Sequence, residues 1–197
     1  EMTSSLVGSE MCIRDRHQPF SLIVFDHHPD MQPPLFKEMI SCGSWVEDVI
    51  KTNPFLKKVI IIGTSEQLIK SVAPQYQNQV EFYSEQSLEQ DTTWKKFSAE
   101  VISTSVYISV DKDVLNPQSA ATNWDQGSFT LEELEQLLSI ILKHEQTIGI
   151  DICGECPATL NIFEEEKEAQ LDSAANKELL KFFLSTQSHA FQQAFKK

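Results

Sequence analysis

Two short groups of acidic and histidine side chains each follow an apolar run of this sequence. Asp26, His28 and Asp30 come directly after the apolar residues 20–25, and Asp111 and Asp113 come directly after residues 106–110. In an extended chain, residues two apart point to the same side, so the side chains within each group can converge. Such a pattern favours one ligand site. The alternative is that the first group is a polar loop and that the second group caps a helix.

Four carboxylates and one imidazole in one place would repel one another strongly unless a cation lay between them. Hard carboxylate oxygens with a single imidazole suit Mn²⁺ well, and Zn²⁺ or Fe²⁺ less well. Carboxylates can also bridge two ions, and bridged ions can ionise a shared water near neutral pH. The residue types therefore predict a divalent metal site that holds two ions.

The remaining pattern predicts the elements that position these two groups. Short apolar runs alternate with amphipathic stretches, which indicates an α/β fold with a mainly parallel, doubly wound sheet. Strands are expected at residues 20–25, 59–62, 80–83, 106–110 and 147–152. Helices are expected from Ser44 to about Lys51, after Ser65, over 88–97, after a capping box at Thr130 and Glu133, and over 176–184, with 163–170 as a solvated loop or helix end. Ligands of such sheets bind beyond the carboxyl ends of the strands, where both groups would lie.

Composition narrows the class of protein. The chain has 197 residues, enough for one domain with a substantial core, and 29 acidic against 16 basic residues give a net charge of −13. This charge argues against nucleic acid or an anionic membrane as a partner. No apolar run approaches the roughly 20 residues of a membrane span. Four cysteines without an export signal predict reduced thiols and a cytoplasmic location.

Residues 1–17 fit no element and are left out of the fold prediction. Residues 5–16 look like a translated cloning adapter of the kind found before unrelated reading frames. We therefore expect a non-native or disordered tail at 1–17 and a single α/β domain at 18–197 that is incomplete at its N-terminus. An ordinary flexible tail is the alternative.

The two acidic groups together resemble the metal motifs of the arginase/ureohydrolase family, which includes arginase, agmatinase and formiminoglutamase. Residues 26–30 resemble its D-x-H-x-D motif, and residues 109–117 resemble S-x-D-x-D-x-x-D-P, with Asn116 in place of an Asp. Residues 127–130 are similar to the G-G-L-T that opens the next helix there. The resemblance covers about residues 20–197.

This resemblance implies a three-layer α/β/α fold with its first part missing, a binuclear Mn²⁺ site, and hydrolysis of a C–N bond in a guanidino, amidino or formimino compound by a metal-bound hydroxide. It implies that Asp26 and Asp111 bridge both ions. Asp30 would complete the ligands of one ion, and His28 with Asp113 those of the other. The expected binding partner is a small cationic, nitrogen-containing substrate. Association into a homo-oligomer is a further expectation.

Three departures from the family pattern bear on the chemistry. A further His ligand expected some twenty residues before Asp26 is absent, so the ion held by Asp30 would lack a ligand. In the family's Ser-His-Gly-Thr motif, Cys42 stands where a proton-shuttling His would be, so Cys42 is a candidate proton shuttle or a small packing residue. Glu155 is shifted by one place from the family's substrate carboxylate and is a candidate substrate contact.

Other readings stay open from the sequence alone. Asn123 lies in a polar loop after a metal strand and is a weaker candidate for substrate contact. A protein that binds metal without catalysis would explain the changed shuttle and the shifted Glu. Cys153 and Cys156 form a C-x-x-C pair, which suggests a thiol redox protein, although such pairs are expected at the N-terminus of a helix.

Overall fold

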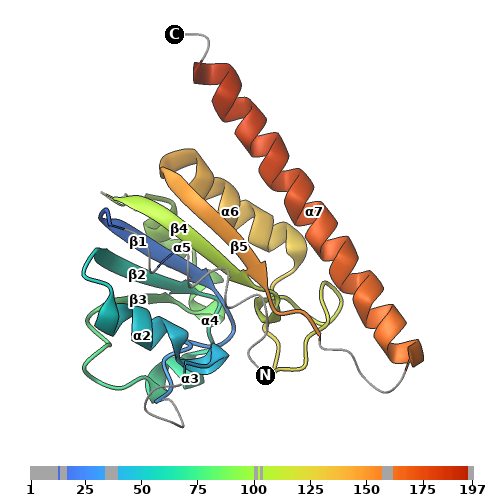
Figure 1. Ribbon diagram of the computed structural model, residues 1–197, viewed down its shortest axis with the longest axis horizontal. Helices are drawn as coiled ribbons and strands as arrows, with labels where there is room; N and C mark the ends of the chain where they lie inside the picture. Colours follow the sequence, from blue (N-terminus) through green and yellow to red (C-terminus); the bar gives the residue numbers. More distant parts are fainter. Residues whose placement is uncertain are drawn as a thin grey trace.

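The computed structural model describes residue 13 and residues 17–33, 40–99, 102, 104–156 and 162–194. Its centre is a five-stranded sheet in the order β3-β2-β1-β4-β5, in which every neighbouring pair is parallel (Figure 1). The strands are β1 (Phe20–Phe25), β2 (Leu56–Ile62), β3 (Val80–Tyr83), β4 (Ser105–Asp111) and β5 (Thr147–Cys153). The predicted parallel α/β sheet is confirmed.

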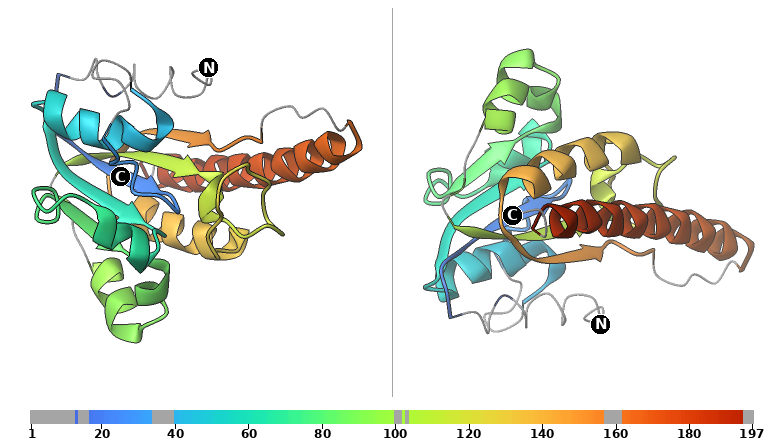
Figure 2. Two further views of the ribbon diagram at one scale, coloured as in Figure 1. Left: turned by 90° about the horizontal axis from the view of Figure 1, so that it is seen from below. Right: turned by 90° about the horizontal axis from the view of Figure 1, so that it is seen from above.

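Helices cover both faces of this sheet, as the views in Figure 2 show. They are α2 (Trp45–Thr52), α3 (Glu66–Ser71), α4 (Glu85–Leu88), α5 (Asp91–Ala99), α6 (Leu131–His144) and α7 (Ile162–Ala194), with short 3₁₀ turns η1 (Cys42–Ser44) and η2 (Lys112–Val114). Buried residues of α2 pack on one face, and those of α5, α6 and α7 pack on the other. The chain therefore has three layers, α/β/α.

The central strand β1 is buried on both faces because its side chains alternate between the two helical layers. Ile23 and Phe25 of β1 belong to the core under α6, whereas Leu22 and Val24 belong to the core under α2. Every residue of β1 is buried. This is why the strand reads as a continuous apolar run rather than as an alternation of apolar and polar residues.

The order of the strands reverses next to β1. The chain passes from β1 to β2 and β3 on one side, and then returns to place β4 and β5 on the other side. In open α/β sheets, the crevice at such a switch point, beyond the carboxyl ends of the two central strands, is where ligands bind. Here the two central strands are β1 and β4, which carry the two acidic groups.

The predicted starts of α6 and α3 are also confirmed. The Thr130 hydroxyl accepts a hydrogen bond from the Glu133 backbone, and the Glu133 carboxylate accepts one from the Thr130 backbone, which completes the capping box of α6. The expected apolar stripe of α6 is buried: Leu134, Leu137, Leu138 and Ile141. Ser65 caps α3 through its side chain.

One helix prediction was wrong. The helix expected at 88–97 is two helices, α4 and α5, because α4 begins earlier with Ser84 as its N-cap and the chain turns at Glu89 and Gln90. Of the two options for 163–170, a solvated loop or a helix end, the structure has the helix end: α7 begins at Ile162 and runs for 33 residues, so the helix expected at 176–184 is part of a longer one. Figure 1 shows α7 crossing the edge of the sheet and extending beyond it.

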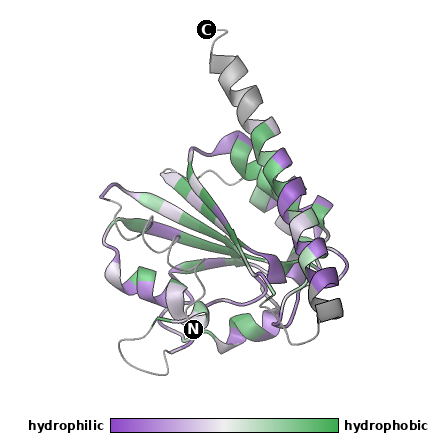
Figure 3. Ribbon diagram, turned by 45° about the vertical axis from the view of Figure 1, so that its right-hand side comes forward, coloured by the Kyte–Doolittle hydropathy of each residue, from purple (hydrophilic) through white to green (hydrophobic). Residues whose placement is uncertain are grey.

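Apolar surface is concentrated where these layers meet, as the colouring of Figure 3 shows along the strands. On α7, Ala175 and Leu179 are buried, whereas Leu180 and Leu184 are exposed. None of the helices in the described part of the chain is both long and apolar enough to cross a membrane.

The proposed boundary between a tail at 1–17 and a domain at 18–197 stays a prediction. Within the first stretch, Ile13 is described: its side chain is buried, and its carbonyl accepts a hydrogen bond of 2.8 Å from the Asn53 amide.

Candidate metal centre

The sheet brings the two acidic groups to one place through the register of its central strands. Phe25 of β1 pairs with Val110 of β4 in a parallel ladder. Asp26, which follows β1, and Asp111, the last residue of β4, therefore lie at adjacent strand ends, although 85 positions separate them in the sequence. Neither group could form this site alone.

The loop after β1 is shaped by hydrogen bonds to its backbone. Oδ1 of Asp26 accepts a hydrogen bond of 2.6 Å from the amide of His28, and the Thr64 hydroxyl donates to the Asp26 carbonyl at 3.0 Å. Asp30 has a φ of 50°. Its carboxylate accepts a hydrogen bond of 2.7 Å from the indole nitrogen of Trp45. The buried face of α2 thereby fixes the orientation of Asp30.

The loop after β4 closes against the first one. Oδ1 of Asp111 accepts from the Asp113 amide at 2.9 Å, which starts the turn η2. The Asp113 carboxylate then accepts from the His27 amide at 3.0 Å and lies 2.7 Å from Nδ1 of His28. As a result, ligand atoms of Asp26, His28 and Asp113 all lie within 4.8 Å of one another.

The electrostatics of this cluster favour a bound cation. Burial raises the pKa of Asp26 well above its usual value, and the charges of Asp30, Asp113 and Asp111 raise it further. Burial and the charge of Asp111 raise the pKa of Asp30 in the same way. Asp111 keeps part of its surface exposed, yet burial and then Asp113 raise its pKa to about 6. Each shift reflects the cost of crowding negative charge into a dry site.

A divalent ion fits this donor set. Buried carboxylates that repel one another would be stabilised in their charged form by a cation, and the mixture of oxygen ligands with one imidazole nitrogen suits Mn²⁺. The side chain of His28 is already oriented by its contact with Asp113, and this contact is the main cause that raises the pKa of His28. The structure therefore brings together the predicted residues Asp26, His28 and Asp113. Asp30 and Asp111 border the same cluster, close enough for their charges to affect it.

The other sequence candidates lie around this cluster in different settings. Cys42 in η1 is exposed as a whole residue, but its thiol is partly shielded from water. This shielding and then the charge of Asp30 raise the pKa of the thiol. Asn123 is exposed in the loop after β4. Glu155 lies beyond β5, where one of its oxygens accepts hydrogen bonds from Lys112 at 2.6 Å and from Asn176 at 2.8 Å.

Lys112 is a functional candidate that the sequence analysis did not identify. It lies between Asp111 and Asp113 at the start of η2, and its side chain is fully buried. Its ammonium group points to Glu155 at 2.6 Å and to the buried Asp172 of α7 at 3.5 Å. The signal in the sequence was a Lys within an acidic motif. Its partner Asp172 could not be inferred, because Asp172 lies between the stretch expected as a loop or helix end at 163–170 and the helix expected at 176–184.

Asp172 links this region to α7. Its carboxylate accepts hydrogen bonds from the backbone of Ala121 at 3.0 Å and of Cys156 at 3.3 Å, besides its ion pair with Lys112. One buried side chain of α7 thus holds the loop after β4, the loop after β5 and η2 together. These three segments border the candidate metal centre.

The two cysteines of the C-x-x-C pair have separate partners. The thiol of Cys153 contacts Asp111 Oδ2 at 3.4 Å, and that of Cys156 contacts Glu168 at 3.3 Å. Burial and nearby carboxylates raise the pKa of both thiols, that of Cys156 to about 11. A reactive redox cysteine needs the opposite shift, because the thiolate is the nucleophile.

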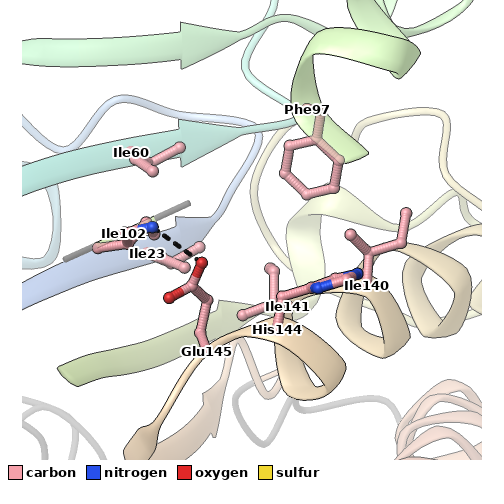
Figure 4. A pocket seen from close by; sticks show the side chains of 8 residues that line it. All are labelled: Ile23, Ile60, Phe97, Ile102, Ile140, Ile141, His144 and Glu145. Atoms are coloured by element: carbon pink, nitrogen blue, oxygen red, sulfur yellow. Dashed lines mark hydrogen bonds between the residues drawn. The ribbon is translucent and has the colours of Figure 1, made fainter. Parts of the chain in front are cut away.

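A small cavity elsewhere in the fold is too small for a substrate. Its volume is about 20 Å³, which is room for a water molecule. Figure 4 shows its apolar lining between the sheet and α6, where Glu145 accepts a hydrogen bond of 2.9 Å from the Ile102 amide. It is bordered by Ile23, Ile60, Phe97, Ile102, Ile140, Ile141, His144 and Glu145, away from the acidic groups.

The chain thus combines a parallel α/β sheet with a carboxylate and histidine cluster at the switch point, an arrangement that could hold a metal ion. Residues 6–162 of the chain match the family model for the arginase family. The chain therefore belongs to the arginase family. The match begins within residues 1–17, the stretch that the sequence analysis set aside.

Solved structures show the same fold. The agmatine ureohydrolase of Thermoplasma volcanium shares 20% identity with a TM-score of 0.71, over 98% of this chain and 62% of its own. Formimidoylglutamase from Bacillus subtilis shares 18% identity with a TM-score of 0.64, over 89% and 55%. Proclavaminate amidino hydrolase from Streptomyces clavuligerus shares 19% with a TM-score of 0.60, over 78% and 53%. The chain thus spans about half to three fifths of the length of these relatives. None of the curated proteins compared with the chain matches it.

Proposed function

We propose that this protein is a divalent metal-dependent hydrolase that cleaves a C–N bond of a guanidino, amidino or formimino compound. The observation that carries the proposal is the convergence of Asp26, His28 and Asp113 within 4.8 Å at the switch point of an arginase-family sheet. The names of the similar structures describe hydrolases of this kind. That likeness supports the proposal through the fold.

The residues proposed to hold metal are Asp26, His28, Asp30, Asp111 and Asp113. Mn²⁺ is the proposed ion. Two ions are proposed for the full-length protein, to which Asp26 and Asp111 would be shared ligands. Bound there, the ions would supply Lewis acidity and lower the pKa of a water molecule. Trp45 and the His28 amide would keep Asp30 and Asp26 in position through the hydrogen bonds that they already donate.

Cys42 is the proposed proton donor. Its raised pKa keeps the thiol protonated near neutral pH, so it can give a proton to the leaving nitrogen when the C–N bond breaks. Asn123 is proposed to contact the substrate from the loop after β4. Glu155 is also proposed as a substrate contact, but a substrate cation would have to compete with Lys112 for its carboxylate.

The test is hydrolysis by the metal-loaded protein. The wild-type protein would be incubated with Mn²⁺ and with agmatine, arginine, 4-guanidinobutyrate and N-formiminoglutamate, and release of urea or formamide would be measured. Asp26→Asn should lose activity at least a hundredfold and bind Mn²⁺ at least tenfold more weakly in calorimetry. Asp125→Asn, which removes an equal charge from the exposed loop, should retain both properties.

The outcomes separate the proposal from its alternative. Mn²⁺ binding that depends on Asp26, without hydrolysis of any compound in the panel, would favour a metal-binding protein without catalysis. Hydrolysis that survives in Asp26→Asn would refute the metal-ligand assignment. A cytoplasmic location and a homo-oligomer stay predictions, which cell fractionation and light scattering can test.

A further inference from the structure

Trp124 is an exposed aromatic residue beside the candidate metal centre. Its relative exposure is 58%, and its ring lies edge-on to that of His28, with 6.2 Å between the ring centroids and 68° between the planes. His28 is itself 2.7 Å from Asp113 in the cluster. A molecule bound at these carboxylates would therefore reach the indole of Trp124.

The loop that carries Trp124 is fixed at several points. The Trp124 amide donates to the Thr122 hydroxyl at 3.3 Å, and that hydroxyl donates back to the Trp124 carbonyl at 3.2 Å. The Gln126 side chain donates to the carbonyls of Leu115 and Ala120 at 3.0 and 3.1 Å. These contacts pull the two ends of the loop together and leave the indole projecting from it.

The end of the loop is hydrogen-bonded directly to η2, the turn that contains Asp113. The Gly127 amide donates to the Asp113 carbonyl at 2.7 Å. A Cβ at Gly127 would lie 2.5 Å from the Val114 carbonyl oxygen, so only glycine allows this close approach. The loop that carries Trp124 is thus fixed to the backbone of Asp113, and this contact keeps the indole beside the cluster.

The exposed indole of Trp124 leaves apolar surface in contact with water, and covering that surface with a ligand would be favourable. Its π face is negative and attracts cations, and planar guanidinium groups stack on it well. The exposed face of the Trp124 indole therefore suits a flat, positively charged group that carries an apolar chain.

We propose that Trp124 is a specificity-determining residue whose ring covers one face of the planar cationic group of the substrate. The proposal rests on the proposed function, because it takes the substrate to bind at the acidic cluster. According to this proposal, the selectivity for a cationic substrate comes from Trp124, which is not one of the proposed metal ligands. The substrate class is an alkyl guanidinium or amidinium.

The test compares two probes that differ in charge and little in shape: n-butylguanidinium and n-butylurea. Their binding to the Mn²⁺-loaded protein would be measured by calorimetry for the wild type, Trp124→Phe and Trp124→Leu. Phe keeps an aromatic face, whereas Leu keeps apolar surface and removes the π system. Mn²⁺ affinity would be measured in parallel and should be the same in all three proteins.

We expect the wild type to prefer the guanidinium probe at least tenfold. Trp124→Leu should lose about fivefold or more of that preference, within the range of cation–π energies, and Trp124→Phe should keep most of it. An unchanged preference in Trp124→Leu would overturn the inference, as would a wild type that binds neither probe.

The two proposals can fail separately. A wild type that binds the guanidinium probe through Trp124 but hydrolyses no substrate would refute the proposed hydrolysis and support the role of Trp124. An active enzyme whose Trp124→Leu variant keeps both its KM and its cation preference would refute the role of Trp124 alone.

Discussion

Asp30 differs from the other carboxylates of the candidate metal centre in its backbone. Its φ of 50° lies in the left-handed region, which costs a residue with a Cβ about 1 kcal/mol relative to the right-handed one. Its carbonyl accepts from the Val46 amide at 3.2 Å, and its carboxylate is held by Trp45. Glycine would remove the strain but would also remove the carboxylate, so the position keeps a strained Asp.

Cys42→Ala should lower kcat at least tenfold and change KM little, because a proton donor acts in the chemical step. Cys42→Ser should fall between Ala and the wild type, since its hydroxyl can still donate. Steady-state kinetics with the best substrate of the panel would measure both.

The matched control for this prediction is Cys156→Ala, whose thiol contacts Glu168 instead of the cluster. Turnover within twofold of wild type in both Cys42 variants would show that Cys42 only packs.

Local spacing predicted the acidic and histidine residues of the candidate site, and the structure brings three of them, Asp26, His28 and Asp113, together. Asp26 and His28 follow a strand directly, so their side chains stay within reach of the strand end whatever the rest of the chain does. Lys112 could not be predicted in the same way. The burial of its ammonium depends on Asp172, which reaches it only because α7 packs across the end of the sheet.

At the scale of elements, α7 holds the loops around the candidate site in place through its polar side chains. Asp172 and Asn176 lie one helical turn apart, and both reach toward the group formed by Lys112 and Glu155. The acidic start of this helix was expected to be a solvated loop or a helix end. Its Glu, Lys, Ala and Gln residues are nevertheless strong helix formers, and that propensity was the better signal.

Lys112→Met should destabilise the protein by about 3 kcal/mol, because it leaves the Asp172 carboxylate buried without its counter-charge. Urea unfolding would measure the change. Lys181→Met is the matched control, since its ion pair with Glu178 is exposed and its loss should cost under about 1 kcal/mol.

A second variant, Lys112→Met with Asp172→Asn, tests the pairing itself. It should be less destabilised than the sum of the single variants, because the second change removes the unpaired charge. Strict additivity would show that the two side chains do not interact.

Glu81 of β3 gives a prediction about pH. Burial alone would raise its pKa, but hydrogen bonds from Lys58 and Lys96 outweigh burial and lower it to about 2. A lowered pKa contributes stability that is present above the ordinary value of 4.5 and is lost as the pH falls toward 2. Glu81→Gln should therefore show a smaller fall in unfolding free energy than the wild type between pH 4.5 and 2.

Denaturant titrations at a series of pH values would measure this difference. Glu132→Gln, on the exposed side of α6, is the control and should follow the wild-type profile. Equal pH profiles for the wild type and Glu81→Gln would rule out the contribution of the Lys58 and Lys96 contacts.

At the scale of the whole molecule, the net charge of −13 should assist a cationic substrate from a distance. Raising the ionic strength from 0.01 M to 0.15 M shortens the Debye length from about 30 Å to about 8 Å. We expect binding of n-butylguanidinium to weaken several-fold over this range and binding of n-butylurea to stay constant. Equal weakening of both probes in calorimetry would contradict this expectation.

The parallel pairing of β1 with β4 also sets the time at which the site can appear during folding. His28 and Asp113 are 85 positions apart, and the whole β2–β3 unit lies between them in the chain. Contacts at such separation form late and slowly, because a long loop must close before they give any stability. A metal ion would therefore meet only three of the five proposed ligands on a nascent chain. Its binding would mark the closing of the central strands, and the rate of metal capture during refolding would report that step.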